Sequence, residues 1–545
     1  MKTQRSPFSR FRAVSVALLC LPAVPGVSAG AAPTAPPPAP IVPKYLAFSD
    51  EVAGRRLLFV ARDSYRNAPA VRVTGRWTLT GPDGTTSGTE TIAARLGEKK
   101  FAMTTETDGG AKTVRRAVAN GAEAGNLLVT RYQDAAPNPT RQFFRVALDE
   151  VTPLSRALAL AQFAPATKAG ELLLAPTWRL ENAATVYVSR LESGGGAVRV
   201  IQTDLPDGGR GQATLLTRRY TLDTKTNRLR RYEEWRTARS QPRPNVARRP
   251  ANNGTRATYR REDYAETTGA TSASAFSQSL PAGYAEQTPP KVNLGRPQAG
   301  PENADQKALV LMRRWATTQE RFLTLNAVAD VQTASVTRTE TSRPLRDGQN
   351  RNGSLLATLW LRRPGRARVV VNRIDPATGQ PSQKADALAV ASGTQVLLND
   401  YANGRSRTLE QRDPADAPLD RLRRIGLPIN DNGLAWIIGG PPQPDQFSSI
   451  LLDGSGAAPV LVLTRTGTED YRQNRDAQTK TVWRVTLGPD NLPREILSRR
   501  ETSVSGMFER DQPPIVTTAL RLRRISVDSE PLPDTFILPQ EITRR

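Results

Sequence analysis

Histidine is absent from this chain of 545 residues, and cysteine occurs once, as Cys20. A catalytic triad or dyad that uses histidine as its base therefore cannot be built, and neither can a histidine-ligated zinc site. A single cysteine can neither close a disulfide within the chain nor supply the several thiolates of a metal cluster. We therefore expect a protein that is not an enzyme, with no catalytic residues, no metal and no cofactor.

The carboxylates offer no catalytic pair either. Glu233 is followed directly by Glu234, and Glu262 by Asp263, in segments that read as β-strands. Neighbouring side chains of a strand point to opposite faces, so the two carboxylates of such a pair cannot converge on one substrate bond. This pattern favours a binding protein.

Basic residues are in excess. Lysine and arginine number 76 against 52 acidic residues, a formal net charge of +24. Such an excess is typical of proteins that bind nucleic acid or anionic membranes, but a GC-rich genome also produces it without either function. The arginines are spread along the chain and do not gather in one tail. We therefore predict no nucleic-acid partner, and keep peripheral contact with an anionic membrane as an alternative.

The N-terminus has the pattern of a secretory signal. Four basic residues precede the short apolar run 13–24, and small residues end the segment at Ala29. The pattern predicts a signal peptide over 1–29, cleaved after Ala29, and a periplasmic or other extracytoplasmic location. Leu19 stands where a lipoprotein cleavage signal requires a small residue, so we expect no lipid anchor at Cys20.

Proline-rich segments divide the rest of the chain. Residues 30–44 predict a tether, and residues 285–301, rich in proline and glycine and poor in large apolar residues, predict a linker. Two domains of similar length remain, at 45–284 and 302–545, in agreement with the length of the chain.

The two predicted domains read alike. Each opens with an amphipathic helix, and each ends with a hairpin, a proline-rich loop, an arginine-containing strand and a phenylalanine before Leu-Pro. The hairpins lie at 220–235 and 485–500, and their shared leucines give an offset of 487 − 222 = 265. Features that recur in order at one offset indicate an internal repeat. The expected buried faces of the two opening helices are Ala53, Leu57, Val60 and Ala61, and Ala308, Met312, Trp315, Ala316 and Leu323.

Between these ends, both halves consist of short alternating segments parted by turn residues. They predict an α+β fold, in which each half is a curved, largely antiparallel sheet with one apolar face and a few covering helices. The enclosed space either holds a ligand or is filled by side chains such as Trp178. Our candidates for lining a ligand cavity are Leu359, Trp360, Trp436, Ile437, Trp483 and Val485 in the second half, and Trp77 and Leu79 in the first.

The second half resembles the outer-membrane lipoprotein carrier (LolA-like) family. The resemblance rests on the order of four segments over about 240 residues: LATLWLRRPGRARVVV (356–371), SGTQVLLNDYANGRSRTLEQ (392–411), TVWRVTLGPDNLPREI (481–496) and LPDTFILP (532–539). It implies an open half-barrel closed by helices, whose apolar cavity carries the acyl chains of a lipid or lipoprotein through the periplasm.

In that family an arginine just before a proline bonds to the helical lid and holds the empty form shut. By match to the motif these residues are Arg363 and Pro364 here. In the first half Arg95 aligns with Arg363, since 363 − 95 = 268, but Leu96 replaces the proline. The resemblance therefore implies that the first half is a degenerate copy of the second.

The expected function is non-catalytic carriage of lipid or acylated protein. Burial of apolar surface supplies the affinity, at roughly 0.8 kcal/mol per methylene, so a greasy pocket needs no charged anchor. Two alternatives remain from the sequence. One is an envelope sensor or regulator that binds a membrane-protein partner with the same fold, and the other is a cationic protein that binds the cell wall or surface.

Overall fold

The computed structural model describes most of the chain between residues 37 and 538. The predicted signal peptide, with Cys20, lies outside the described residues. The described ranges are 37–82, 84–108, 112–120, 126–134, 139–148, 154–174, 183–189, 196–204, 212–240, 257–266, 273–280, 282–287, 303–336, 353–363, 365–392, 395–401, 404–410, 432–454, 458–471, 475–508 and 511–538.

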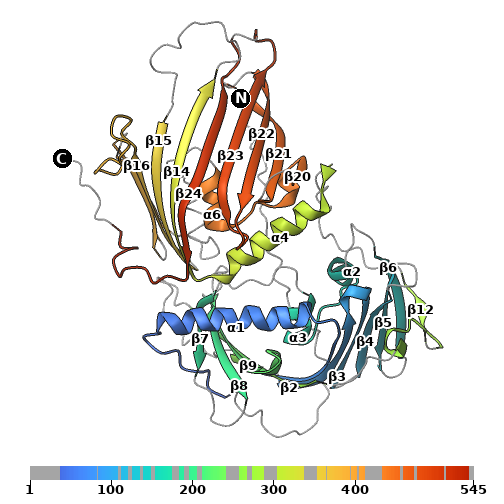
Figure 1. Cartoon of the computed structure of the whole chain (residues 1–545). Helices are drawn as coiled ribbons and strands as arrows, with labels where there is room; N and C mark the ends of the chain where they lie inside the picture. Colours follow the sequence, from blue (N-terminus) through green and yellow to red (C-terminus); the bar gives the residue numbers. More distant parts are fainter. Residues whose placement is uncertain are drawn as a thin grey trace, which may run out of the picture.

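Two 12-stranded sheets, one from each half of the chain, form the body of the fold (Figure 1). Every pairing between strands is antiparallel except at two edges, where the two-residue strands β12 and β13 pair in parallel with β6 and β20. The prediction of an α+β fold with largely antiparallel sheets is confirmed. The first sheet comprises β1 (Val71–Gly81), β2 (Gly84–Arg95), β3 (Lys100–Asp108), β4 (Thr113–Ala119), β5 (Asn126–Gln133), β6 (Thr140–Ala147), β7 (Ala183–Ser189), β8 (Ala197–Asp204), β9 (Gln212–Asp223), β10 (Leu229–Ser240), β11 (Ala257–Glu266) and β12 (Ala285–Glu286). The second comprises β13 (Asn303–Ala304), β14 (Thr324–Val336), β15 (Gly353–Arg362), β16 (Arg366–Arg373), β17 (Ala387–Ser392), β18 (Gln395–Asp400), β19 (Arg405–Glu410), β20 (Ser449–Asp453), β21 (Val460–Tyr471), β22 (Arg475–Leu487), β23 (Pro493–Val504) and β24 (Ile515–Val527).

The two sheets share one connectivity. β1 lies between β2 and β11, and β14 lies between β15 and β24. From this central strand, the strands that follow it in sequence extend to one edge, ending at β6 or β19. The last strands of each half extend to the other side, back to β7 or β20. The first long strand of each half, β1 or β14, is therefore paired with the last long strand of that half, β11 or β24. The residues of β12 fall within the predicted linker but pair with the first sheet.

Five described α-helices lie on these sheets. Among the described residues, no helix is long and apolar enough to cross a membrane. The helix α4 buries Ala308, Met312 and Trp315, as its periodicity predicts, and the Asp305 side chain caps its start by accepting from the Lys307 amide at 2.8 Å. The helices are α1 (Phe48–Arg66), α2 (Leu154–Leu160), α3 (Lys168–Leu174), α4 (Gln306–Arg321) and α6 (Asn432–Gly439).

The predicted buried face of α1 is only partly right. Ala61 is buried, but Val60 is 43% exposed, and Leu58 and Tyr65 are buried instead. The reason is that α1 is covered on more than one side. It packs on β7 and α3 of its own half and also contacts α4 of the second half, so charged residues such as Arg62, 3% exposed, are buried as well.

Among the described residues, four ion pairs join α1 to the second half. Each has at least one partner whose side chain is largely buried or half-buried, which reduces screening by solvent. Arg362 also lies over the Phe48 ring, 5.7 Å from its centroid. The pairs are Glu51 with Arg362 at 2.7 Å, Arg56 with Asp528 at 3.4 Å, Arg62 with Glu320 at 3.7 Å, and Asp63 with Arg321.

Part of the predicted tether packs on the first sheet. The Trp235 indole N–H donates to the Pro37 carbonyl at 2.8 Å, and the Tyr187 hydroxyl donates to the Ile41 carbonyl at 3.4 Å. A proline-rich segment does not pair as a β-strand, so its carbonyls remain available as hydrogen-bond acceptors. Its proline rings can pack against aromatic side chains of the sheet. The described part of the segment, from residue 37, is therefore attached to the outer face of the sheet.

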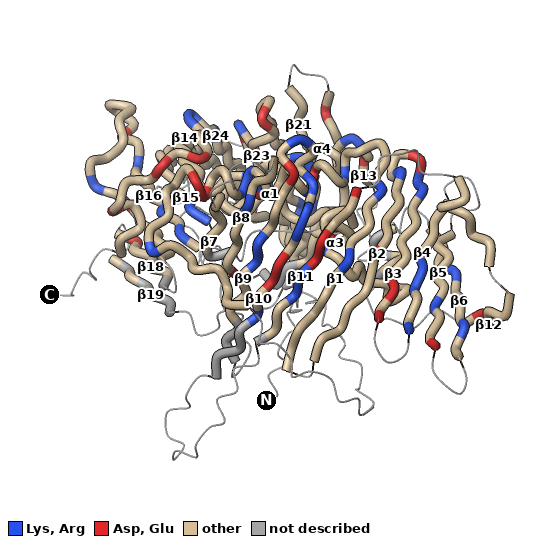
Figure 2. Tube along the Cα trace, turned by 90° about the horizontal axis from the view of Figure 1, so that it is seen from below, with Lys and Arg blue, Asp and Glu red and all other residues tan. Residues whose placement is uncertain are grey.

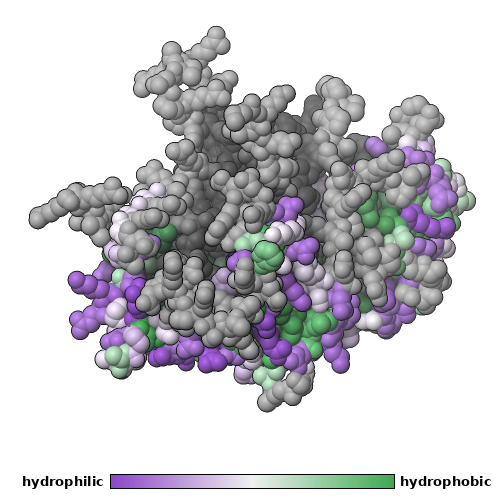
Figure 3. Space-filling model, turned by 90° about the horizontal axis from the view of Figure 1, so that it is seen from above, coloured by the Kyte–Doolittle hydropathy of each residue, from purple (hydrophilic) through white to green (hydrophobic). Residues whose placement is uncertain are grey.

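The outer faces of both sheets are mainly polar, with local apolar covers. Phe276 is 2% exposed and packs on Ala93, Ala102 and Val118, and Phe536, its counterpart in the repeat, is 6% exposed. Seen from above, hydrophilic side chains dominate the described periphery, with smaller apolar patches between them (Figure 3). The large apolar surfaces of the sheets thus face inward.

We expect Gly54→Ala to destabilise the protein, although alanine is normally the better helix residue by about 1 kcal/mol. A Cβ at Gly54 would lie 2.9 Å from the backbone of Tyr187, so α1 would have to move off β7. The loss should be about 1–3 kcal/mol, as for other overpacked contacts, and denaturant unfolding measures it. Gly353→Ala is the control, because nothing lies within 4 Å of its added Cβ. A Gly54→Ala protein more stable than the wild type would show that α1 does not dock this closely.

Candidate functional site

The inner face of the second sheet is apolar over most of its width. Side chains that pair across neighbouring strands form continuous rows, because residues opposite each other share one face. Nearly all are alanine, valine or leucine, with exposures of 2% or less. One row is Ala327, Leu359, Val369 and Ala389, a second is Leu325, Leu361, Ala367 and Ala391, and a third is Val331, Leu520, Ile496, Val485 and Leu461.

The short helix α6 covers this face with an aromatic cluster. Trp436 of α6 lies between Trp315 of α4, Phe447 and Trp483 of β22, at centroid distances of 6.4, 6.4 and 5.4 Å. Phe447 and Trp483 also meet edge to face at 5.8 Å. Such packing depends on burial and dispersion and not on directional bonds. We call α6 the lid of the second sheet.

Arg363 and Gln319 connect the lid to the rest of the half. Arg363, 7% exposed, donates from Nη2 to the Gln319 carbonyl at 2.8 Å, near the end of α4. Its guanidinium lies 5.4 Å from the centroid of Phe322. The Gln319 side chain in turn donates to the Ile437 carbonyl in α6. A cation at the C-terminal end of a helix is favourable, because the last carbonyls carry partial negative charge. We call Arg363 and Gln319 the latch.

The structure brings most of the predicted cavity residues together. Leu359, Trp436, Ile437, Trp483 and Val485 belong to one buried cluster between the sheet and the lid.

The other candidates lie elsewhere. Trp360 is half-buried on the opposite face of β15 from Leu359, as alternation along a strand requires. Trp77 and Leu79 are half-buried on β1 of the first half, away from this cluster, with the Trp77 ring across Gly88. Trp178 and Pro364 lie outside the described residues.

The inner face of the first sheet differs, because it contains buried carboxylates. Glu90 and Glu262 have no exposed surface. Glu90 accepts the backbone N–H groups of Ala166 at 2.5 Å and Thr167 at 3.2 Å, and Glu262 accepts that of Lys168 at 2.7 Å. These are donors at the start of α3, so the two carboxylates hold the positive end of that helix on the sheet.

Arginines hold the preceding helix in the same way. Arg131 donates to the Ala161 carbonyl at 2.8 Å, and Arg115 donates to that of Gln162, just after α2. Burial, assisted by the charge of Arg131, lowers the pKa of Arg115 to about 10. The segment 154–174 is therefore fixed at one helix end by arginines and at the next by carboxyl groups.

The charged network extends across β9, β10 and β11, where Figure 2 shows residues of both signs close together. Glu234 receives hydrogen bonds or ion pairs from Tyr232, Arg218 and Arg236, at 2.5, 3.3 and 2.8 Å. Burial alone would raise its pKa, but the two arginines outweigh burial and hold the pKa at about 2. The first half thus combines an apolar core with a buried charged network, whereas the rows of the second sheet described above are apolar throughout.

Sequence reasoning missed this network, although one signal was present. Glu90 shares the parity of Ile92 and Ala94 on β2, both 1% exposed, so it had to point inward. Glu262 and Glu234 were set aside as poor catalytic pairs, and their burial was not anticipated. Arg95, the counterpart of Arg363, pairs with Glu98 at 3.3 Å, and its side chain is 30% exposed.

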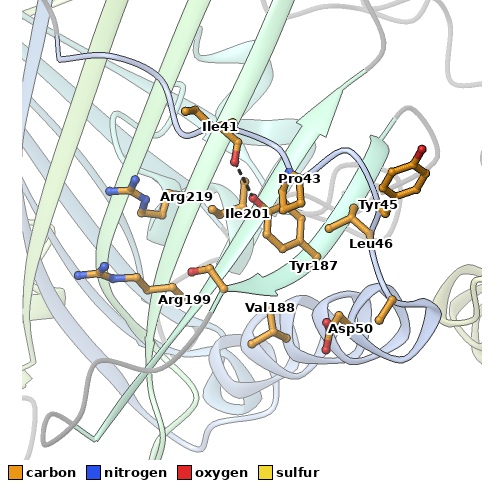
Figure 4. A pocket seen from close by; sticks show the side chains of 12 residues that line it. Ile41, Pro43, Tyr45, Leu46, Asp50, Tyr187, Val188, Arg199, Ile201 and Arg219 are labelled. Carbon is orange, nitrogen blue, oxygen red and sulfur yellow. Dashed lines mark hydrogen bonds between the residues drawn. The ribbon is translucent and has the colours of Figure 1, made fainter.

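A separate hollow lies on the outer face of the first sheet. It has a volume of about 420 Å³, and it lies between the N-terminal segment and strands β7, β8 and β9. Figure 4 shows Arg199 and Arg219 side by side at one end, with Tyr187 bonded to the Ile41 carbonyl across it. It is open to solvent and distant from the lid, and none of the predicted cavity residues lines it.

No protein-family model matches this chain, and no curated protein matches it. A solved domain assigned to outer-membrane lipoprotein sorting, from Vibrio parahaemolyticus, is 10% identical, with a TM-score of 0.21. The match covers 42% of this chain and 96% of that one. A protein assigned as AttH, from Nitrosomonas europaea, is also 10% identical, with a TM-score of 0.10 and coverage of 89% and 99%. We therefore argue function from the geometry of the chain itself.

Glu90 should make stability depend on pH near neutrality. Burial raises its pKa from 4.5 to about 7, although hydrogen bonds from Thr167 and Ala166 oppose the shift. The folded protein then binds a proton more tightly than the unfolded chain, so stability should rise as the pH falls from about 7 towards 4.5. This stability should be lost as the pH rises from 4.5 to about 7, by roughly 1.4 kcal/mol per pH unit at most, and the dependence should level off above 7, where the carboxyl is ionised in both states.

Thermal unfolding between pH 5 and pH 8 checks this, and the absence of histidine leaves few other groups titrating there. Glu90→Gln should flatten the dependence, whereas Glu98→Gln, at a half-exposed surface site, should leave it unchanged. A wild-type stability that is flat across this range would contradict the shift.

Proposed function

We propose that the protein is an exported, non-catalytic carrier that shelters the acyl chains of a lipid or lipoprotein against the inner face of its second sheet. The observation that carries the proposal is that apolar face, uninterrupted by charge across its rows and covered by an eight-residue lid. The predicted signal peptide and periplasmic location are part of the proposal.

The exchange of lid for ligand is energetically feasible. When Trp436 leaves the sheet, it uncovers the side chains that it packs on, such as Trp483, and an acyl chain can enter and lie along the aliphatic inner face. Each buried methylene contributes roughly 0.8 kcal/mol. One apolar contact replaces another, so the loaded and empty forms differ little in free energy, as reversible carriage requires.

The latch gives the empty form its stability. Arg363 ties the β15–β16 turn to the end of α4, and Gln319 extends this tie to the lid. Opening the lid breaks the Gln319 contact and leaves buried polar groups without partners, at a cost of about 1–3 kcal/mol for each. This cost returns as a driving force for closure when the ligand leaves.

We further propose that the two halves are tandem LolA-like domains, at 45–284 and 302–545, which derive from one duplicated unit. The common connectivity of the sheets and the recurrence of sequence features at one offset support this. In the first domain the segment 154–174 occupies the position of the lid, between β6 and β7, and charged groups hold it down. The carrier function is therefore assigned to the second domain.

Protein purified from its native envelope without detergent should contain about one equivalent of an acylated molecule, seen by native mass spectrometry. After its removal, a long-chain fatty acid should rebind and change tryptophan emission, because Trp436 would leave Trp483. Val369→Phe should fill the inner face and abolish binding, at a cost in stability of about 1–3 kcal/mol. Its neighbour Val370→Phe, on the outer face of the same strand, is the control. Protein without lipid that also ignores the fatty acid would refute the carrier function.

Arg363→Leu should retain uptake and impair release. The variant loses the bond to the Gln319 carbonyl and thus the driving force for closure, so the loaded form is favoured by about 1–3 kcal/mol, tenfold or more in affinity. Transfer of a bound fatty acid to acceptor vesicles measures this. Arg366→Leu, an exposed arginine of the same turn, should release normally. Unchanged transfer by Arg363→Leu would exclude the latch role.

A further inference from the structure

The four ion pairs described above meet the second half at one place in the fold, although their partners are far apart in the sequence. Their second-half partners are Glu320, Arg321, Arg362 and Asp528. Glu320 directly follows Gln319 in sequence, and Arg362 directly precedes Arg363. The helix α1 therefore contacts the second half beside both residues of the latch.

Asp528 brings the fourth pair to the same place. Its Oδ1 accepts the Leu323 amide at 2.7 Å, and its own amide donates to the Thr324 carbonyl at 2.9 Å. The Arg363 amide donates to the Leu323 carbonyl at 2.9 Å. The junction between α4 and β14 is thus held on one side by Arg363, on another by Asp528, and from outside by α1.

From this convergence we propose that the first half is an intramolecular restraint on the lid. While α1 is docked, the end of α4 and the β15–β16 turn are joined into one rigid body, and Gln319 keeps the lid on the sheet. When the ion pairs are broken, these two elements can separate and α6 opens more readily. The inference rests on the proposed function, in which opening of the lid admits an acyl chain. It assigns the first half a regulatory role in place of a second cargo site.

The pairs have the features that such a role requires. The Arg62 side chain is 4% exposed and its partner 17%, and the Glu51 side chain is 11% exposed. Partial burial makes such pairs stronger than surface pairs. In three of the four pairs one side chain is at least 30% exposed, so undocking leaves most of these charges in contact with solvent, and only Arg62–Glu320 is largely buried on both sides. Rising ionic strength should weaken docking, because the pairs are electrostatic.

The test is hydrogen exchange of the lid amides, 432–440, in the ligand-free full chain, followed by mass spectrometry. Arg362→Glu and Glu51→Arg should each speed this exchange about fivefold, the change that a partly buried ion pair of ordinary strength produces. The double variant, which restores the pair with reversed charges, should return within about twofold of the wild type. Arg56→Glu, at a residue whose side chain is 65% exposed, should act in the same direction and poses little risk to folding.

Arg484→Glu is the matched control. It breaks a 2.6 Å pair with Asp453 that lies within the second sheet, away from α1. The restraint is overturned when the interface variants exchange no faster at the lid than this control, or when the charge swap fails to restore protection. The exchange measurement contains no lipid, so it tests the restraint separately from the carrier function. If the lid responds to the variants but the protein binds no acyl chain, the carrier function is refuted and the restraint stands. If the protein binds an acyl chain but the lid does not respond, the restraint is refuted and the carrier function stands.

Discussion

The need to cover the apolar face of a long antiparallel sheet governs this structure. Hydrogen bonding satisfies the backbone of each 12-stranded sheet, but alternation leaves one whole face of aliphatic side chains to be removed from water. Five α-helices of the described residues are available to cover the two faces, and α1 and α4 are the long ones. What covers each inner face, and how firmly it is held there, decides what each half can do.

Apolar packing covers the inner face in both halves, but the covering helices are held by different interactions. In the first, Glu90, Glu262, Arg115 and Arg131 hold the ends of α2 and α3 through charge-assisted hydrogen bonds, which are directional and costly to break without a replacement. In the second, aromatic rings cover the face through non-directional contacts that another apolar molecule can replace. This difference is the reason that we assign the proposed carrier role to the second half.

Residues with a clear parity or period could be predicted from the sequence. Alternation placed Leu359, Trp483 and Val485 on an apolar face. The 3.6-residue period placed Ala308, Met312 and Trp315 on the buried face of α4 correctly, but Ala316 is only half-buried and Leu323 lies beyond the end of the helix. Trp360, another predicted cavity residue, lies on the other face of β15, because it directly follows Leu359 in the strand. The buried face of α1 could not be predicted from its helical period. The second half of the chain covers another side of this helix, and it buries charged residues that an amphipathic pattern would place in solvent.

The sequence by itself determined the local elements, their recurrence at one offset and the exclusion of histidine chemistry, because these depend on residue type and spacing along the chain. Only the tertiary structure decided which of the arginines in a chain with 76 basic residues bind a helix end, a turn or the other half of the chain. The reason is that such contacts join positions up to hundreds of residues apart. Arg362 and Arg363 make the difference plain. They are adjacent and chemically identical, yet one is paired with Glu51 of the first half and the other lies beneath the end of α4, since consecutive side chains leave the end of a strand in different directions.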